Sequence, residues 1–212
     1  MTAQEKFSSA MASLPLVAIL RGIRPDEAAD VATALVGSGF RLIEVPLNSP
    51  QPLASIEALS ASYPQALVGA GTVLSVQQVG EVHAAGGQLI VSPNFDADVV
   101  REAVRLGMVC LPGVLTASEA FAALAAGAAG LKLFPAEMIP PAAVKALRAV
   151  IAADVALLPV GGISPANMAG YRAAGASGFG IGSSLYQSGR ELPAIAAAAR
   201  AFADAWTGTM RA

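Results

Sequence analysis

The chain has 212 residues, of which 55% are hydrophobic and 13% charged, and its formal net charge is −2. No apolar run reaches the roughly 18 uncharged residues that a membrane span requires, and no basic stripe is present, so we expect neither a membrane nor a nucleic acid as a partner. The chain has one histidine, His83, and one cysteine, Cys110. These counts exclude a zinc site of several His or Cys ligands and an internal disulfide, and they suit a cytoplasmic location.

The first 14 residues predict an N-terminal extension or helix rather than a signal peptide, because they lack a clear basic region and cleavage site. Eight short apolar runs then predict strands, at 16–20, 41–45, 67–71, 88–92, 108–112, 130–134, 156–160 and 178–182. Helical patterns lie between and after them, several with a proline or a capping residue at the start, at 24–39, 49–63, 75–87, 96–107, 116–128, 142–150, 164–176 and 192–206.

This alternation of strands and helices predicts an α/β fold, and we expect a (β/α)8 TIM barrel near its minimum length. The alternative is a doubly wound open sheet. The barrel is favoured because the strands are evenly short and no dinucleotide-binding glycine motif follows the first of them. No linker or low-complexity tract interrupts the sequence, so residues 1–212 are expected to form a single domain.

Three charged residues lie at or near the ends of these strands: Arg21, Glu44 and Lys132. In such a barrel the carboxyl ends of the strands carry the catalytic groups. A lysine in an apolar site has a lowered pKa, and its neutral amine can form a Schiff base with a carbonyl while a carboxylate moves the protons. The alternative is a Glu44–Lys132 ion pair with no chemical role, although buried ion pairs are poor stabilisers.

Glycine-rich segments follow the last two predicted strands and resemble a phosphate cradle, because glycine lets backbone N–H groups approach an anion closely. The residues are Gly161 and Gly162 in the first segment, and Gly182, Ser183 and Ser184 in the second. The sequence SSLY is expected to start a short helix there. Further rim candidates are the hydroxyl of Thr72, the Pro93–Asn94 pair and the apolar wall of Phe134.

The remaining ionisable candidates are expected to have no role in the site. Lys6 lies near a terminus that we expect to be flexible, and Lys145 lies in an amphipathic helix, where it should face solvent. His83 is expected at a surface helix end, and Glu137 at a solvated helix start. No metal site is therefore predicted.

The motifs LRGI, EVPLNSP, GAGTVL, SPN, GLKLFPAE, VGGISPAN and GIGSSLY resemble, in this order, those of the class I 2-keto-3-deoxy-6-phospho-sugar-acid aldolases. The resemblance extends from Pro15 to Tyr186. LRGI and EVPLNSP are similar to the galactonate branch of the family. The gluconate branch typically has an arginine in the loop after the glutamate, where this chain has Pro46, Leu47 and Asn48, so carboxylate binding would pass to Arg21.

The resemblance implies cleavage of 2-dehydro-3-deoxy-6-phosphogalactonate to pyruvate and glyceraldehyde 3-phosphate, with no metal or organic cofactor, by a homotrimer. It implies that Lys132 forms the Schiff base and that Glu44 is the general acid and base. Arg21 and Thr72 would bind the carboxylate end. Gly161, Gly162, Gly182 and Ser183 would bind the phosphate.

Three alternative functions remain open from the sequence. The first is cleavage of the gluconate epimer. The second is a phosphosugar isomerase or a phosphate-binding synthase on the same barrel, which would use the same glycine cradle without a Schiff base. The third is a non-catalytic sensor of sugar phosphates, against which the pairing of a lysine with a glutamate at strand ends argues.

Overall fold

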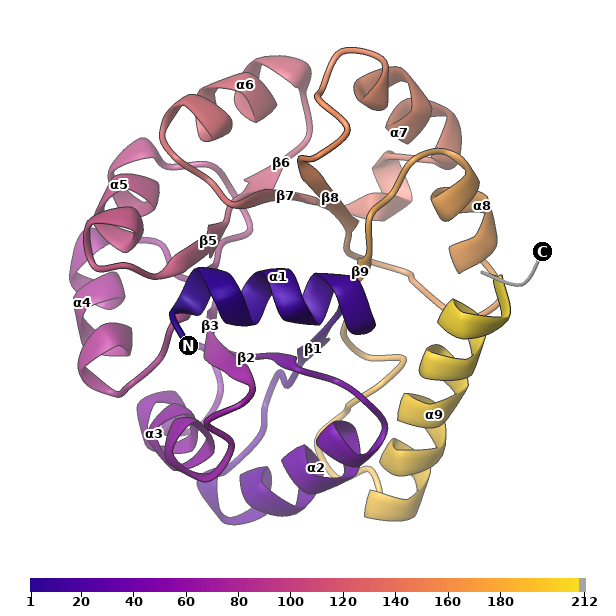
Figure 1. Ribbon diagram of the computed structural model, residues 1–212. Coiled ribbons are helices and arrows are strands. Elements are labelled where there is room, and N and C mark those ends of the chain that lie inside the picture. Colours follow the sequence, from indigo (N-terminus) through magenta and orange to yellow (C-terminus); the bar gives the residue numbers. More distant parts are fainter. Residues whose placement is uncertain (210–212) are drawn as a thin grey trace.

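The computed structural model describes residues 1–209, in which helices alternate with parallel strands (Figure 1). The strands are β1 (Leu16–Ile19), β2 (Leu42–Pro46), β3 (Leu67–Gly71), β4 (Leu89–Val91), β5 (Val109–Leu111), β6 (Gly113–Val114), β7 (Gly130–Leu133), β8 (Ala156–Pro159) and β9 (Phe179–Ile181). The helices are α1 (Ala3–Ser13), α2 (Pro25–Gly37), α3 (Pro52–Ser62), α4 (Val76–Ala84), α5 (Ala97–Arg105), α6 (Ala117–Ala125), α7 (Pro141–Arg148), α8 (Met168–Ala173) and α9 (Leu192–Thr209), with one short 3-10 helix, η1 (Ala136–Met138).

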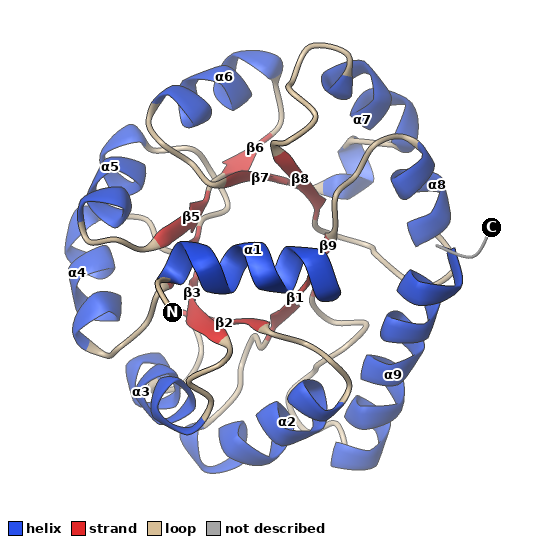
Figure 2. Cartoon of the chain, in the orientation of Figure 1, coloured by secondary structure: helices blue, strands red, loops and turns tan. Residues whose placement is uncertain are grey.

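All the strand pairings are parallel. Six strands form one sheet in the order β5-β4-β3-β2-β1-β9, and three form a second in the order β6-β7-β8. A bridge between Val160 and Gly180 joins the end of the second sheet to β9. Figure 2 shows the strands around a common centre, with helices α2 to α9 outside them. The chain is therefore a parallel α/β structure.

The fifth predicted strand, 108–112, ends before Pro112 in the structure, and a further short strand, β6, begins at Gly113. Proline has no N–H group to continue a ladder of hydrogen bonds, and the partner strand changes at this point, since β5 pairs with β4 and β6 pairs with β7. The carbonyl of Pro112 still accepts a hydrogen bond from the N–H of Lys132 at 3.0 Å. The prediction of eight strands is thus corrected to nine within residues 1–209, because β6 lies beyond the predicted run and was not predicted.

The strands have one face toward the helices and one toward the centre, and both faces are apolar. Alternate residues such as Ile43 and Leu131 belong to the larger core cluster, which includes the apolar sides of the helices. Their neighbours, such as Val17, Leu42 and Leu158, form a second cluster inside the ring of strands. Strands buried on both faces explain the continuous apolar runs of the sequence.

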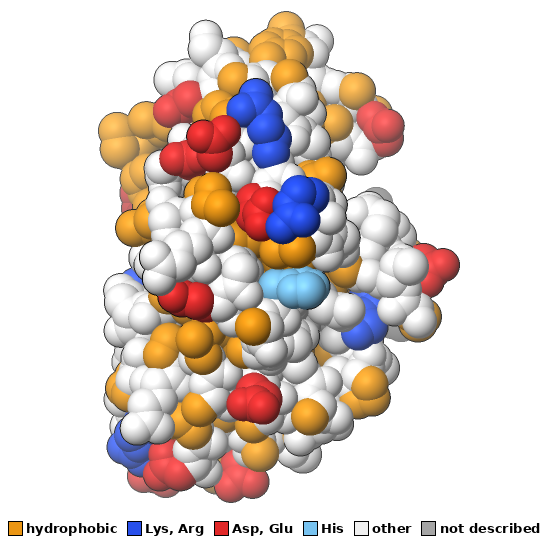
Figure 3. All heavy atoms as spheres, turned by 90° about the vertical axis from the view of Figure 1, so that its left-hand side faces the viewer, with side chains coloured by type: hydrophobic (Ala, Val, Ile, Leu, Met, Phe, Trp, Pro, Cys, Tyr) orange, Lys and Arg blue, Asp and Glu red, His pale blue; other side chains and the backbone are white. Residues whose placement is uncertain are grey.

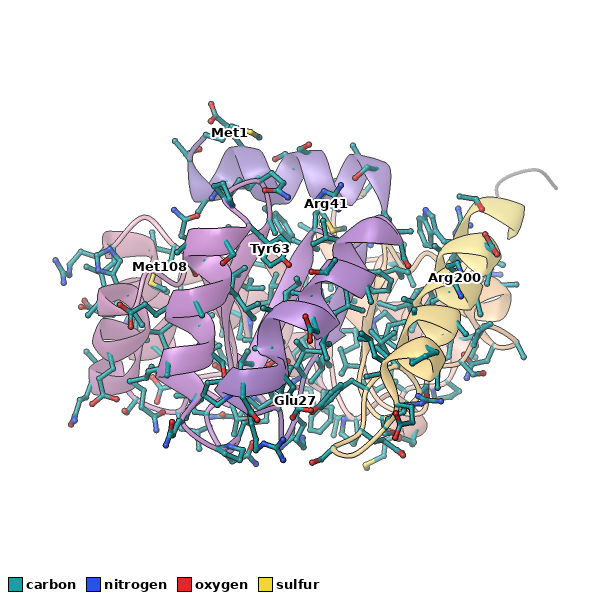
Figure 4. All side chains as sticks on the ribbon, turned by 90° about the horizontal axis from the view of Figure 1, so that it is seen from below. Met1, Glu27, Arg41, Tyr63, Met108 and Arg200 are labelled. Atoms are coloured by element: carbon teal, nitrogen blue, oxygen red, sulfur yellow. The ribbon has the colours of Figure 1, made fainter. Side chains whose placement is uncertain are left out.

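Helix α1 closes one end of this interior. Its buried residues Ala3, Phe7 and Ala10 belong to the inner cluster. Figure 4 shows α1 across one end of the molecule with Arg41 beside it, whereas Glu27 lies at the opposite end. Arg41 directly precedes β2, so α1 covers the amino ends of the strands. The expectation of a flexible Lys6 was wrong, because Lys6 lies in α1 and its Nζ donates to Oε1 of Gln88 at 2.7 Å.

Two helices begin later than the sequence pattern predicts. Helix α3 begins at Pro52, after Gln51 in the left-handed region, and α8 begins at Met168 rather than at Ser164. Asn167 accounts for the second difference, since its side chain accepts from the N–H of Ser164 and donates to the carbonyl of Gly162, which holds a turn in place of a first helical turn.

The exposed residues agree with their expected positions. His83 is exposed in the last turn of α4, and Lys145 is exposed on α7. Figure 3 shows the face that carries α4 and α5, where hydrophobic side chains are scattered among polar ones and the histidine is visible. No helix within residues 1–209 is long and apolar enough to cross a membrane.

Candidate active site

The alternation along two strands points Lys132 and Glu44 toward the interior. Leu131 and Leu133 pack in the outer core, so Lys132 between them faces the centre, and Ile43 and Val45 do the same for Glu44. Both side chains line a small inner cavity of about 10 Å³. The cavity is otherwise walled by apolar side chains and one glycine: Val17, Ile19, Val91, Leu111, Leu158, Val160 and Gly180.

Burial sets the charges of this pair. Lys132 is 6% exposed and Glu44 is 1% exposed. Desolvation raises the pKa of the Glu44 carboxyl from 4.5 to about 7, against the opposing effects of the Lys132 and Arg21 charges. Desolvation also lowers the pKa of the Lys132 amine, and Glu44 opposes this shift while Arg21 adds to it. Both groups are therefore less strongly charged near neutral pH than they would be in water.

The geometry does not fit an ion pair with a purely structural role. Among residues 1–209, no carboxylate lies within 4.0 Å of the Lys132 nitrogen, Glu44 included. Oε2 of Glu44 is buried and has no hydrogen-bond partner among the described groups. Leaving a buried carboxylate oxygen without a partner costs stability, so the arrangement needs another reason to exist.

Gly71 makes the room that Glu44 needs, and sequence reasoning missed its importance. A side chain at Gly71 would overlap the Glu44 carboxylate, so any larger residue there would displace this carboxylate from its present position. The next residue, Thr72, has φ +58°, a region that β-branched residues rarely adopt. A glycine inside a strand is a recognised sign of close approach, and this signal was present in the GAG motif.

A larger cavity of about 510 Å³ opens from the carboxyl ends of β1, β7, β8 and β9. It shares Ile19, Lys132, Val160 and Gly180 with the small cavity, so Lys132 lies where the two meet. The structure brings eight of the predicted site residues to this cavity: Arg21, Lys132, Phe134, Gly161, Gly162, Gly182, Ser183 and Ser184. The Nζ of Lys132 lies 4.8 Å from the centre of the Phe134 ring.

The glycine-rich segments present unused hydrogen-bond donors to this cavity. Within residues 1–209, the backbone N–H groups of Gly161, Gly162, Gly182 and Ser183 donate to no protein acceptor. The two segments are joined to each other, because Oγ of Ser184 donates to the carbonyl of Ile163 at 2.8 Å. Gly161 and Gly162 have φ values of +116° and +61°, which favour glycine. Such a set of converging donors is suited to an anion.

The helix expected at SSLY is absent, and this prediction was wrong. The segment forms a single turn in which the N–H groups of Leu185 and Tyr186 both donate to the carbonyl of Gly182. The chain then continues as a loop, and its residues Tyr186, Gln187 and Ser188 also line the larger cavity, a contribution that was not predicted. Donors at this end thus come from loop backbone rather than from a helix terminus.

Glu137 lies at the cavity, contrary to the expectation that it has no part in the site. It is exposed in η1, yet it lines the larger cavity and its carboxylate packs against Gly161 and Gly162. A negative charge therefore lies beside the unused backbone donors.

Thr72 and Pro93 are not brought to either cavity. Thr72 nevertheless follows Gly71, which touches Glu44, at the carboxyl end of β3. The carbonyl of Pro93 lies against Gly113, and that of Asn94 accepts from the N–H of Gly113 at 3.2 Å. In residues 1–209, no three His, Cys, Asp or Glu side chains gather as a candidate metal site.

Comparisons with known proteins show the family of the chain. A profile of the family described as "KDPG and KHG aldolase" matches residues 7–196. The chain is 48% identical over 194 residues to the 2-dehydro-3-deoxy-6-phosphogalactonate aldolase of Escherichia coli K12, which covers 91% of this chain and 95% of the relative. It is 51% identical over 176 residues to a probable aldolase of the same name from Rhizobium meliloti. This match covers 82% of this chain and 83% of the relative. A solved structure described as native KDPGal has a TM-score of 0.92 at 47% sequence identity. The match covers 94% of this chain and 97% of the solved chain.

Proposed function

This chain belongs to the KDPG and KHG aldolase family, and we propose that it is a class I aldolase that cleaves 2-dehydro-3-deoxy-6-phosphogalactonate to pyruvate and D-glyceraldehyde 3-phosphate. The observation that carries the proposal is the inward-facing Lys132 beside the buried Glu44, at the inner end of a cavity whose rim offers unused backbone N–H groups. The names of the two relatives support the galactonate substrate over its gluconate epimer.

The proposal includes the full architecture. The bridge from β8 to β9 and the hydrogen bonds from Lys132 and Ala129 to the carbonyls of Pro112 and Cys110 support joining the two sheets into one closed (β/α)8 barrel. In this description β5 and β6 are the two parts of the fifth strand. Residues 1–212 then form one domain, with α1 as an N-terminal extension that covers the amino end of the barrel.

The substrate is oriented by its two charged ends. Its phosphate accepts hydrogen bonds from the backbone N–H groups of the Gly161–Gly162 and Gly182–Ser183 segments. Its carboxylate pairs with Arg21, which lines the larger cavity. Phe134 forms an apolar wall between these ends. The keto carbon then lies at Lys132, where the two cavities meet.

Cleavage begins when the neutral amine of Lys132 attacks the C2 carbonyl carbon. Loss of water from the resulting carbinolamine gives an iminium ion that is attached to Lys132. The C4 hydroxyl then loses its proton, the C3–C4 bond breaks, and its electron pair moves through C3 toward the iminium nitrogen. The C4 fragment leaves as the aldehyde of glyceraldehyde 3-phosphate, and an enamine remains on the enzyme.

Glu44 moves the protons in these steps. As a carboxylate it takes the proton of the C4 hydroxyl, and as a carboxylic acid it assists loss of water from the carbinolamine. It then returns a proton to C3 of the enamine, and hydrolysis of the new iminium releases pyruvate. A carboxyl group whose pKa is raised to about 7 is suited to both directions of transfer near neutral pH.

A paired assay tests this function. The purified enzyme is supplied separately with the galactonate compound and with its gluconate epimer, and released pyruvate is followed by a coupled reaction. We expect pyruvate from both, with a higher kcat/KM for the galactonate compound. A preference for the gluconate epimer would reverse the substrate assignment, and no pyruvate from either would reject the aldolase.

We also propose a homotrimer in the cytoplasm. Exposed apolar side chains support subunit contacts, because Leu115, Met138 and Val150 are 39%, 65% and 58% exposed and line one groove beside α7. The single free cysteine, Cys110, is buried and has its pKa raised to about 12 by desolvation, which suits a protein that carries no disulfide.

A further inference from the structure

The loop that carries Arg21 is attached to the loop that follows β2 by two side-chain hydrogen bonds. Nη1 of Arg21 donates to Oδ1 of Asn48 at 3.0 Å. The backbone N–H of Gly22 donates to Oγ of Ser49 at 2.9 Å. Asn48 and Ser49 directly follow the strand that carries Glu44, so one element presents the acid and also holds the arginine.

The acceptor that holds the guanidinium is neutral. Within residues 1–209, no carboxylate lies within 4.0 Å of Arg21. An amide oxygen accepts one N–H of the guanidinium and leaves its positive charge uncompensated, whereas a carboxylate would pair with it and occupy two donors. Because Arg21 lines the larger cavity, its charge remains available to an anion that enters there.

Ser49 fixes the backbone beneath this side chain. It is only 7% exposed, although Asn48 beside it is exposed. Gly22, whose N–H it accepts, has φ +86°, so the chain reverses there in a conformation that few other residues adopt. The direction in which Arg21 leaves the loop therefore depends on the hydroxyl of Ser49.

We propose that Asn48 and Ser49 are positioning residues that hold Arg21 toward the carboxylate of the substrate while leaving its charge free. This inference rests on the proposed function, since it assigns the carboxylate end of the same cavity. It explains how the chain binds that carboxylate with an arginine from the loop after β1 and only neutral residues in the loop after β2.

Substitutions at these two positions test the inference. Asn48→Asp keeps the shape but places a carboxylate on Arg21, and Asn48→Ala removes the acceptor. We expect the KM of Asn48→Asp to rise about tenfold or more, because its carboxylate would compete with the substrate carboxylate for Arg21. A hydrogen bond to a charged group is worth roughly one to two powers of ten in affinity. The KM of Asn48→Ala should rise less, because that variant loses only the acceptor that holds Arg21. In both variants kcat should change less than threefold and Tm should be kept.

The matched control is Gln51→Glu, which adds the same charge to the same loop at a residue whose side chain makes no capping hydrogen bond. Its KM should stay close to that of the unmodified enzyme. Ser49→Ala should raise KM, and Ser49→Thr should restore it by keeping the hydroxyl.

Three results would overturn the inference. These are an unchanged KM in Asn48→Asp, an equal rise in Gln51→Glu, or a parallel loss of kcat and Tm that indicates a structural role alone. In each of these three cases the unmodified enzyme would still release pyruvate. Failure of the proposed function is distinguishable, because in that case the unmodified enzyme itself would release no pyruvate.

Discussion

The direction of the Lys132 side chain is set by its two neighbours in β7. Leu131 and Leu133 face the helices, so the period of two in a strand leaves the lysine no direction but the interior. The same rule places Glu44 between Ile43 and Val45. The sequence predicts this pair well, because alternation depends only on residue order. It does not predict Gly71, whose role depends on contact between two strands.

At Glu44 we predict a stability effect that depends on pH. Its pKa in the folded chain is raised from 4.5 to about 7, so the folded state favours the protonated form. The unfolded chain loses this proton at lower pH, and the free energy of unfolding therefore decreases as pH rises between these two values. Glu44→Gln removes this cost. The free energy of unfolding of the variant minus that of the unmodified enzyme should therefore be about 3 kcal/mol larger at pH 8 than at pH 5, since one pKa unit corresponds to about 1.4 kcal/mol.

Urea unfolding at both pH values measures this difference, with the exposed Glu57→Gln as control. The control should show no comparable change between the two pH values. The same Glu44→Gln variant should turn over about 10²- to 10⁴-fold more slowly, the usual range for a positioned acid or base. A variant with no pH-dependent gain in stability would contradict the buried, proton-binding state of Glu44.

For Glu137 we predict a gain of affinity on substitution. Its carboxylate packs against Gly161 and Gly162, where the phosphate of the substrate is proposed to bind, and like charges at close range repel. Glu137→Gln should therefore lower the KM for the phosphorylated substrate by about threefold to tenfold, with the larger effect at low salt because screening is weaker there. Steady-state kinetics at two salt concentrations measure this, and a raised KM would show that the carboxylate assists binding instead.

Among the elements, α1 has the least obvious role from sequence, because its helical pattern says nothing about which surface it covers. The structure places Phe7, which is 4% exposed, against the interior of the strands at the end opposite to the site. Helix α1 lines neither site cavity. It should therefore contribute to stability rather than to catalysis.

Phe7→Ala is predicted to lower the free energy of unfolding by about 3 kcal/mol, because removal of a buried aromatic ring loses apolar burial and leaves a cavity. The control is Ser8→Ala, at an exposed position on the same helix, which should stay within about 0.5 kcal/mol. Chemical denaturation measures both, and turnover at 25 °C should be unchanged in each. A fall in kcat without a fall in stability would contradict the separation of this helix from the site.

The differences at element scale come from tertiary contacts. The end of β5 before Pro112 could be anticipated from the missing N–H of proline, but the pairing of Gly113 with Lys132 depends on a contact between two separate strands. The late start of α8 depends on the two side-chain bonds of Asn167. At SSLY, the hydroxyl of Ser184 bonds to the neighbouring loop, and a single turn replaces the expected helix. Short-range patterns do not contain these interactions.

At the scale of the whole molecule, one end of the strands is covered and the other is open. Helix α1 covers the amino ends, and the larger cavity opens at the carboxyl ends, so we expect substrate to enter there. The sequence predicted eight of the residues around that cavity, because glycine-rich segments and charged residues at strand ends mark it. Gln187 and Ser188 lie there without any such signal, since loop conformation alone brings them in.

The outer surface yields a prediction about assembly. Val150→Asp places a charge in the apolar groove beside α7 and should shift the proposed trimer toward smaller species. Val76→Asp is the control, at a similarly exposed valine that begins α4. Sedimentation velocity separates these outcomes, and an unchanged trimer in Val150→Asp would place the subunit contacts elsewhere.

The most direct measurement is reduction of the enzyme with borohydride in the presence of pyruvate, followed by mass analysis of its peptides. We predict one reduced pyruvate adduct per chain, on Lys132, and none on Lys6 or Lys145. The Lys132→Ala variant should form no adduct and lose several orders of magnitude in turnover, because within residues 1–209 no other lysine lines the site cavities. An adduct on another lysine, or turnover by Lys132→Ala within about tenfold of the unmodified enzyme, would contradict the account.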